Sequence, residues 1–166
     1  MANYPFWPEL LLERANMSSI RHNSLMNLSS SLTTLSLRSC DLRGKLENNV
    51  LCLLGIQTLD LTGNWELEGS LLKSNWSCSS LKFLGLFGRM FSREFLNSIG
   101  NLKSLKHLAL PGCNFMRSIP AWLRNLTYLD LSNNSFSSEI LLPLLNFRFF
   151  WPMHQTNKFL IIGEYF

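Results

Sequence analysis

No long basic run is present in this sequence, although its formal net charge is +4. The lysines and arginines are scattered, without five or more in succession, so we expect no stripe that would bind nucleic acids or lipids. The charge should only aid solubility and weak electrostatic steering. A stretch of about 18 uninterrupted apolar residues, which a membrane-spanning helix needs, is also missing. We therefore predict neither a nucleic-acid partner nor a membrane span for this chain.

A secretory signal is not recognisable in the first residues, MANYPFWPELLLE. They lack a basic n-region, and Pro5, Pro8 and Glu9 interrupt their apolar stretch. We expect no signal peptide in this segment.

Motifs for metal binding and catalysis are absent as well. The four cysteines form no CxxC pair and have no histidine partners at zinc-site spacing; they are Cys40, Cys52, Cys78 and Cys113. His22, His107 and His154 have no acid or nucleophile at a recognisable spacing, and no GxSxG, HExxH or phosphate-loop pattern occurs. We predict that the chain is not an enzyme and that it holds no metal or cofactor.

A motif of the form LxxLxLxx(N/C)xL recurs at a spacing of about 24 residues. Its copies are LTTLSLRSCDL (32–42), IQTLDLTGNWEL (56–67), LKFLGLFGRMF (81–91), LKHLALPGCNF (105–115) and LTYLDLSNNSF (126–136). Seven positions of each full copy are apolar, with Asn75 as the one exception, whereas the 46% apolar composition would fill only about half of them by chance. The repeat therefore determines the predicted fold.

Each copy predicts one coil that cannot bury its own apolar side. In the LxL segment the two leucines point inward and the residues between them point outward, so neighbouring coils must cover each other. Stacked coils place their short strands side by side in a parallel sheet. We predict an α/β-type solenoid: a horseshoe arc with a parallel β-sheet on the concave face and irregular or short helical convex segments.

The ninth position of the motif favours a small group that can bond to main-chain amides where the chain leaves the strand. The residues there are Cys40, Asn64, Arg89, Cys113 and Asn134. We expect Cys40 and Cys113 to be small buried groups without a redox role. Cys52 and Cys78 lie near the ends of successive coils, so they could form a convex-side disulfide or remain unpaired.

The segment CNFMRSIPAWLRNL (113–126) resembles the plant extracellular leucine-rich repeat, whose pattern continues after the strand as GxIPxxLxxLxx. At the glycine of that pattern only Gly44 and Gly69 remain, with Arg93, Arg117 and Ser138 in the other copies, which puts the tight backbone turn there in doubt. The fourth copy is short, with 21 residues from Leu105 to Leu126, so we infer a deletion on its convex side.

Residues 16–46 and 98–115 are similar to the ectodomain of plant receptor-like proteins. The resemblance implies perception of a ligand at the plasma membrane or outside the cell, with a partner receptor kinase supplying catalysis. Family members also have a signal peptide, caps, many more repeats and a membrane anchor, none of which we identify here, so we interpret the chain as a fragment. We divide it into a non-repeat leader (1–9), a degenerate first repeat (10–31), five plant-type repeats (32–147) and a non-repeat apolar tail (148–166).

The tail is not the polar cap that the end of a solenoid needs. It suggests a truncated or mispredicted gene product, or else a segment that folds back as a lid over the last coil.

Ligand binding should use strand residues that point outward, because the scaffold holds them in rigid rows. The candidates are Arg38, Gln57, Asp60, Lys82, Phe83, Phe87, Lys106, His107, Tyr128 and Asp130. Phe83, Phe87 and Tyr128 are the strongest candidates, since exposed aromatic side chains often anchor partners. The alternative is that these rings only pack along the surface of the sheet.

Glycosylation is predicted at the N-x-S/T sequons, which begin at Asn16, Asn27, Asn75, Asn125 and Asn133. We favour Asn27 and Asn75 over Asn133, because a glycan on Asn133 would crowd the concave face. Together with the repeat type, the sequons indicate a protein of the secretory route.

The sequence as a whole favours a segment of a plant cell-surface receptor-like protein that recognises a protein or peptide, and the resemblance implies a role in pathogen defence signalling. The main alternative is a secreted protein like the polygalacturonase inhibitors, which use a similar repeat. A cytosolic immune-receptor repeat domain is a third interpretation, and it predicts no glycosylation.

Overall fold

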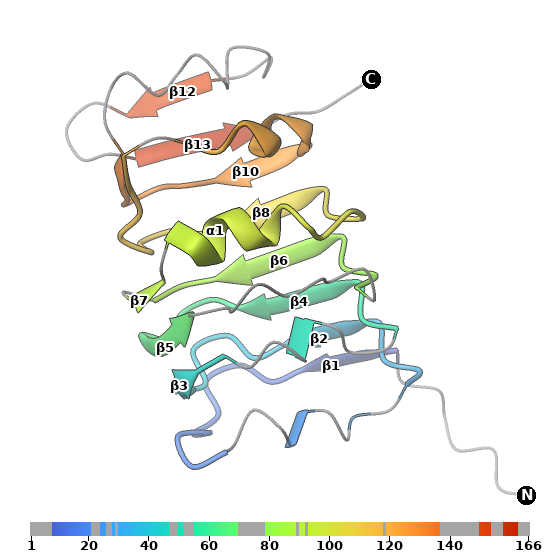
Figure 1. Ribbon diagram of the computed structural model, residues 1–166. Helices are drawn as coiled ribbons and strands as arrows, with labels where there is room; N and C mark the ends of the chain where they lie inside the picture. The colour runs from blue at the N-terminus through green and yellow to red at the C-terminus, as the bar shows by residue number, and fades with distance from the viewer. Residues whose placement is uncertain are drawn as a thin grey trace, which may run out of the picture.

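The structure, a computed structural model, consists of short strands stacked one above another along the chain (Figure 1). It describes residues 8–20, 24–25, 28, 30–46, 50–51, 55–69, 79–88, 90–91, 93–117, 119–136, 150–153 and 158–162.

The main sheet contains one strand from each successive coil. Its parallel strands are β1 (Glu9–Leu11), β2 (Thr34–Ser36), β4 (Thr58–Leu61), β6 (Phe83–Leu86), β8 (His107–Ala109) and β10 (Tyr128–Asp130), and they are neighbours in that order. Five of them coincide with the LxL segments of the repeat. The register joins equivalent leucines, as in the pairs Leu35 with Leu59 and Leu59 with Leu84. The predicted parallel sheet is therefore confirmed.

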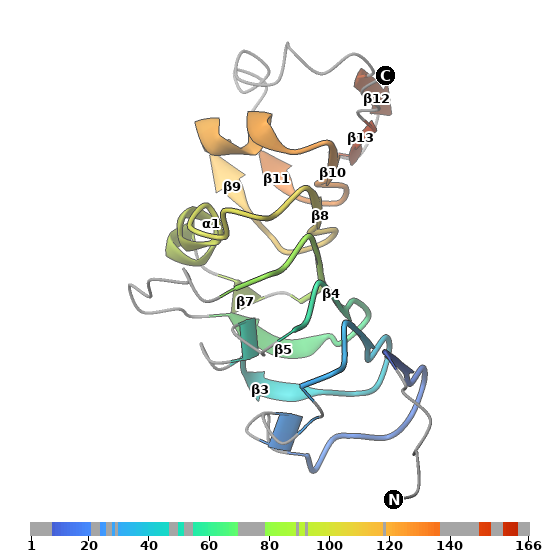
Figure 2. The ribbon, with the colours of Figure 1, turned by 90° about the vertical axis from the view of Figure 1, so that its right-hand side faces the viewer.

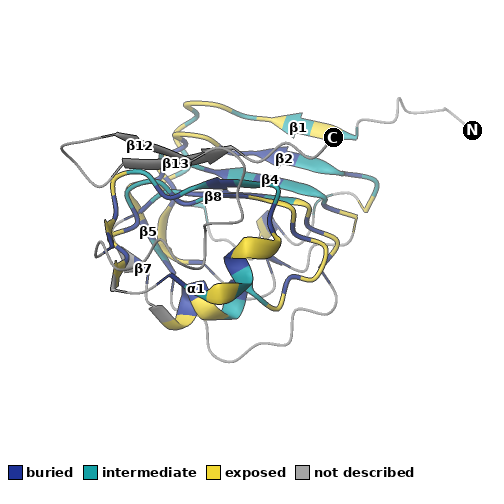
Figure 3. Ribbon diagram, turned by 90° about the horizontal axis from the view of Figure 1, so that it is seen from above, coloured by how far each residue is buried: buried dark blue, intermediate teal, exposed yellow. Residues whose placement is uncertain are grey.

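The core is a continuous column of leucines behind this sheet. The first leucine of each LxL segment is 0% exposed, and the second is at most 1% exposed, over Leu35, Leu37, Leu59, Leu61, Leu84, Leu86, Leu108, Leu110, Leu129 and Leu131. Viewed from above, the buried residues lie between the main sheet and the segments opposite it (Figure 3). Each coil thus buries its leucines against its neighbours, which confirms a solenoid. The horseshoe curvature stays a prediction.

Short strands and helices make up the rest of each coil (Figure 2). Strands β3 (Arg43–Lys45), β5 (Glu66–Gly69) and β7 (Met90–Phe91) form one small parallel sheet, and β9 (Met116–Arg117) pairs with β11 (Ser135–Phe136) in another. Helix α1 (Arg93–Ile99) covers the side of the core opposite the main sheet (Figure 3), and the 3-10 helix η3 (Ala121–Asn125), orange in Figure 2, lies on the same side.

Two coils make the turn at the glycine position of the pattern without a glycine. Among the retained glycines, Gly44 has a positive φ of 82°, whereas Gly69 is not in that region. Arg93 begins helix α1 and Arg117 lies in strand β9, and neither is among the described residues with positive φ. These two coils therefore pass this point with a backbone that any residue adopts. Ser138 lies outside the described residues.

The two ends of the main sheet are built differently. At the start, β1 pairs with β2, and the Met17 amide donates a hydrogen bond to the Cys40 carbonyl over 2.8 Å. Residues that precede the five clear repeats therefore run alongside the first of these repeats and extend the stack by one coil. At the other end, β13 (Lys158–Ile162) pairs antiparallel with β10, and β12 (Phe150–Met153) pairs antiparallel with β13. The main chain of the tail thus folds back beside the last coil, as the lid alternative expected.

Asparagines at the ninth motif position link adjacent coils through their side chains. Asn64 is 0% exposed, and its Oδ1 accepts hydrogen bonds from the amides of Cys40 and Leu42, both at 3.0 Å. Its Nδ2 donates to the carbonyls of Leu37 (2.9 Å) and Leu61 (2.7 Å). In the last coil, Asn134 Oδ1 accepts from the Phe115 amide (3.0 Å), and its Nδ2 donates to the carbonyls of Leu110 (2.8 Å) and Leu131 (2.9 Å). The predicted bonding to main-chain amides is confirmed at both positions.

The two cysteines at this position replace only part of the asparagine's bonding. The Cys40 thiol donates to the Leu12 carbonyl (3.0 Å), and the Cys113 thiol to the Leu86 carbonyl (3.8 Å). Both side chains are buried and neither is in a disulfide. They are the small buried groups that the sequence predicted, while Arg89, Cys52 and Cys78 lie outside the described residues.

Cys113 is expected to be nearly unreactive while the protein is folded. Burial raises the pKa of its thiol to about 12. At pH 8 only about one thiol in 10,000 would then be ionised, and the thiolate is the reactive species. We expect iodoacetamide to alkylate Cys113 at least about 100-fold more slowly in native buffer than in denaturing urea, as measured by peptide mass spectrometry. Equal rates in the two conditions would contradict the burial of this side chain.

Candidate ligand-binding face

All ten predicted binding residues lie among the described residues, either in the strands of the main sheet or directly before or after one of them. We call the side of the sheet that faces away from the leucine core the strand face. Four of the residues are exposed there, namely Arg38, Lys82, Lys106 and His107. The others are half-buried, namely Gln57, Asp60, Phe83, Phe87, Tyr128 and Asp130.

Three ring side chains occupy the same position on successive strands. Phe83 is the register partner of His107, and His107 is the partner of Tyr128. The rings of His107 and Tyr128 have centroids 6.2 Å apart. We call Phe83, His107 and Tyr128 the ring row. Because consecutive strands hold it, its geometry depends on the sheet and not on a loop.

The members of the ring row differ in how far their side chains are engaged in contacts with the sheet. A Cβ placed on Gly85 would lie 3.1 Å from Phe83 Cε1, so the Phe83 ring covers this glycine and packs along the sheet, as the alternative interpretation expected. Burial raises the pKa of the Tyr128 phenol, and the Asp130 carboxylate adds to the shift. The Tyr128 hydroxyl therefore stays protonated at neutral pH and can donate a hydrogen bond.

The two predicted acidic residues also have structural contacts. Asp60 Oδ1 accepts from the Thr62 amide (2.9 Å) and hydroxyl (2.7 Å), and Asp130 Oδ1 accepts from the Ser132 amide (2.8 Å). Each carboxylate thus closes the turn after its strand. Asp60 Oδ2 additionally lies 3.8 Å from Arg38 Nε. The signal for this role is present in the sequence, since a hydroxyl residue follows each aspartate by two positions.

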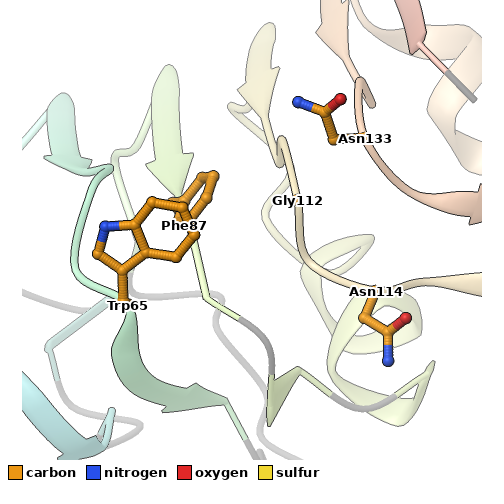
Figure 4. Close-up of a pocket in the computed structure, with 5 residues that line it drawn as sticks. All are labelled: Trp65, Phe87, Gly112, Asn114 and Asn133. Carbon is orange, nitrogen blue, oxygen red and sulfur yellow. The ribbon is translucent and has the colours of Figure 1, made fainter. Parts of the chain in front are cut away.

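A pocket of about 490 Å³ lies next to the strand face, where the chain turns out of the strands (Figure 4). Trp65, Phe87, Gly112, Asn114 and Asn133 line it. Trp65 is 59% exposed, and its ring meets that of Phe87 edge to face, with centroids 4.2 Å apart. A Cβ on Gly112 would lie only 2.8 Å from Phe87 Cε2, so this residue must be small to seat the ring.

The sequence predicted two of the pocket residues, Phe87 for binding and Asn133 for glycosylation. It missed Trp65, Gly112 and Asn114. The available signal for Trp65 is its position directly after Asn64, in the copy with the extra residue.

The described sequons all begin with an exposed asparagine, at Asn16, Asn125 and Asn133. Asn16 Oδ1 accepts from the amide and hydroxyl of Ser18, the third residue of its own sequon. Asn27 and Asn75, the two favoured sites, lie outside the described residues. Glycosylation of all five stays a prediction.

No helix in the described part of the chain is long and apolar enough to cross a membrane. Over the same residues, histidine, cysteine, aspartate and glutamate side chains form no group of three that could hold a metal ion.

Comparison with known proteins identifies the repeat. The model of the Leucine Rich Repeat family matches residues 104–126 and 125–147. Three similar proteins come from Arabidopsis thaliana. Receptor-like protein 6 is 36% identical over 106 residues, which cover 60% of this chain and 10% of the relative. Receptor-like protein 49 is 40% identical over 110 residues (64% of this chain, 12% of the relative), and Receptor-like protein 50 is 43% identical over 90 residues (50% of this chain, 10% of the relative). These similarities confirm the leucine-rich repeat and the predicted resemblance to plant receptor-like proteins. The chain spans only about a tenth of the length of these relatives.

Proposed function

We propose that this chain, as a leucine-rich repeat protein of the plant receptor-like type, recognises a protein or peptide through the strand face. The observation that carries the proposal is the ring row, in which Phe83, His107 and Tyr128 stand side by side on three hydrogen-bonded strands. Aromatic side chains held on a rigid scaffold can bury a large apolar area on binding at little cost in conformational entropy.

The charges around the ring row favour a ligand with acidic groups. Lys82 and Lys106 precede Phe83 and His107 and are exposed, whereas the nearby carboxylates of Asp60 and Asp130 already accept hydrogen bonds from their turns. The net charge of +4 acts in the same direction, because it draws an acidic partner toward the surface.

The remaining parts of the proposal concern the longer protein to which such a segment would belong. That protein would be extracellular or anchored in the plasma membrane, and it would depend on a receptor kinase as co-receptor for signalling, with pathogen defence as the proposed setting. Its repeats would continue this solenoid into a horseshoe, with the strand face on the concave side. The chain itself would be non-catalytic, which is typical of receptor-like proteins.

The names of the relatives support a receptor over the inhibitor alternative, since all three are receptor-like proteins. Sequencing the transcript on both sides of this segment separates the two. A membrane-spanning segment downstream favours the receptor, and a complete secreted reading frame without one favours the inhibitor.

The ring row can be tested with a triple variant, Phe83→Ala, His107→Ala and Tyr128→Ala. The full chain, expressed behind a secretory leader and immobilised, would be exposed to proteins and peptides washed from the plant apoplast, with bound species quantified by mass spectrometry. We expect at least one species to bind the unchanged chain and to lose about tenfold or more of its binding to the triple variant, because a central aromatic contact is often worth about 2 kcal/mol.

A matched control carries Asn97→Ala, Asn101→Ala and Ser104→Ala, three exposed residues outside the strand face whose replacement leaves the net charge unchanged. This control should bind as the unchanged chain does, and circular dichroism should give both triple variants the native spectrum. Equal loss in the two variants, or full retention in the ring-row variant, would argue against recognition by the strand face.

A further inference from the structure

The acceptor asparagine of one sequon stands at the wall of the pocket. Asn133 begins the sequence Asn133-Asn134-Ser135, is exposed, and lines the pocket together with Trp65 and Phe87. Its neighbour Asn134 is only 3% exposed, and its side-chain amide bonds to the main chain of Leu110, Leu131 and Phe115. Asn133 is therefore the side chain at this turn that a glycosyltransferase could reach, and Ser135 beside it is also exposed.

The opposite wall of the pocket has the chemistry that a sugar ring needs. One face of a pyranose ring presents C–H groups, which pack well against an aromatic ring, and its edge carries hydroxyl groups that pair with carboxamides. Trp65 is 59% exposed and lines the pocket beside Phe87, so it offers apolar ring surface that a sugar in the pocket could cover. Asn114 adds a carboxamide on the Asn133 side of the aromatic pair, beside Gly112 (Figure 4).

The distance from Asn133 to the aromatic pair determines how many sugar residues are needed to reach Phe87. Phe87 follows strand β6, Gly112 follows β8 and Asn133 follows β10, so the pocket extends across neighbouring coils. With strands about 4.8 Å apart, Asn133 lies about 10 Å from Phe87 along the sheet. Gly112 lines the pocket between these two residues, and because it has no side chain it leaves the path between them open. One sugar is too short for this span, and the two-sugar core of an N-linked glycan fits it.

We propose that Asn133 is N-glycosylated and that the two N-acetylglucosamine residues of its glycan core lie in the pocket, crossing Gly112 to pack on Phe87 and Trp65. The inference rests on the proposed passage through the secretory route. It reverses the preference of the sequence for Asn27 and Asn75, because the glycan on Asn133 occupies a preformed pocket at the end of the strands. It covers the aromatic pair and leaves the ring row open for a ligand.

The test compares glycoforms of the full chain, secreted behind a leader from a host that makes only oligomannose glycans. One sample keeps the glycan, a second is trimmed by endoglycosidase H to a single N-acetylglucosamine, and a third is stripped by peptide N-glycosidase F. Hydroxyl-radical footprinting with peptide mass spectrometry then gives the oxidation rate of Trp65, normalised to a radical dosimeter added to every sample.

We expect Asn133 to carry a glycan and Trp65 to be oxidised roughly threefold more slowly in the intact form, because the core sugars would cover most of the exposed ring. Trimming to one sugar should already restore the rate at Trp65. The Ser135→Ala variant, which lacks the sequon but keeps Asn133, should behave as the stripped form, and a thermal melt shows whether it is folded.

Two results would overturn the proposal. One is an Asn133 without a glycan. The other is a Trp65 oxidation rate that is the same in the intact, trimmed and stripped forms. Neither outcome depends on ligand binding by the ring row, so a failure here and a failure of the proposed function are distinguishable.

Discussion

Replacing Leu84 by alanine is expected to lower the free energy of unfolding by about 2 to 5 kcal/mol, the range for a fully buried leucine whose site cannot collapse. Leu84 is 0% exposed and lies in β6, between register partners Leu59 and Leu108 on the neighbouring strands. The substitution therefore leaves a cavity that three coils share. Urea denaturation followed by circular dichroism measures the loss.

The consequence should reach beyond one coil. A small domain is stabilised by about 5 to 15 kcal/mol in total, and a solenoid of few coils depends on the contacts between neighbours. Leu84→Ala in the middle of the sheet can therefore unfold much of the chain at room temperature. Leu11→Ala is the matched control, because that leucine is 59% exposed in the end strand β1 and should change stability by less than about 0.5 kcal/mol. Similar losses in both variants would show that Leu84 is not part of a shared core.

The fold was predictable because its main constraint, the burial of leucines in every coil, repeats at a regular spacing along the sequence. A leucine pair such as Leu59 and Leu61 must face inward in every coil, and the same need recurs about two dozen residues later. Spacing alone therefore gave the strands, their parallel order and the buried face. The bonding of Asn64 followed from the same reasoning, since a chain that leaves a strand exposes amides that need an acceptor.

The candidate site was only partly predictable, because the repeat indicates which side chains face outward but not what they contact. Asp60 was expected to be available for a ligand, yet its carboxylate closes a turn with Thr62. The pocket depends on Trp65 reaching Phe87 of the next coil, and a contact between side chains of different coils has no signature in either copy. The antiparallel pairing of β13 with β10 likewise arises from the tertiary structure, in a segment without the repeat.

Asn64→Ala is expected to cost about 2 to 5 kcal/mol, as much as the loss of a core leucine, although it removes a polar side chain. Asn64 is 0% exposed and makes four hydrogen bonds, and a buried main-chain group left without its partner costs about 1 to 3 kcal/mol. The alanine would deprive the amides of Cys40 and Leu42 of their acceptor. Urea denaturation gives the free energy, and Asn97→Ala, at an exposed position of α1, is the control that should change little.

The cysteines at the equivalent positions make the prediction sharper. The Cys40 thiol donates to the Leu12 carbonyl as Asn64 Nδ2 donates to Leu37, but sulfur is a weak acceptor for amides. Asn64→Cys should therefore retain one of the two donated hydrogen bonds and lose less stability than Asn64→Ala. If alanine is tolerated as well as cysteine, with both within about 0.5 kcal/mol of the unchanged chain, these side-chain bonds do not stabilise the stack. If alanine is clearly worse, each asparagine at this position joins two coils through the main chain, and the leucines alone are not sufficient to keep the coils in register.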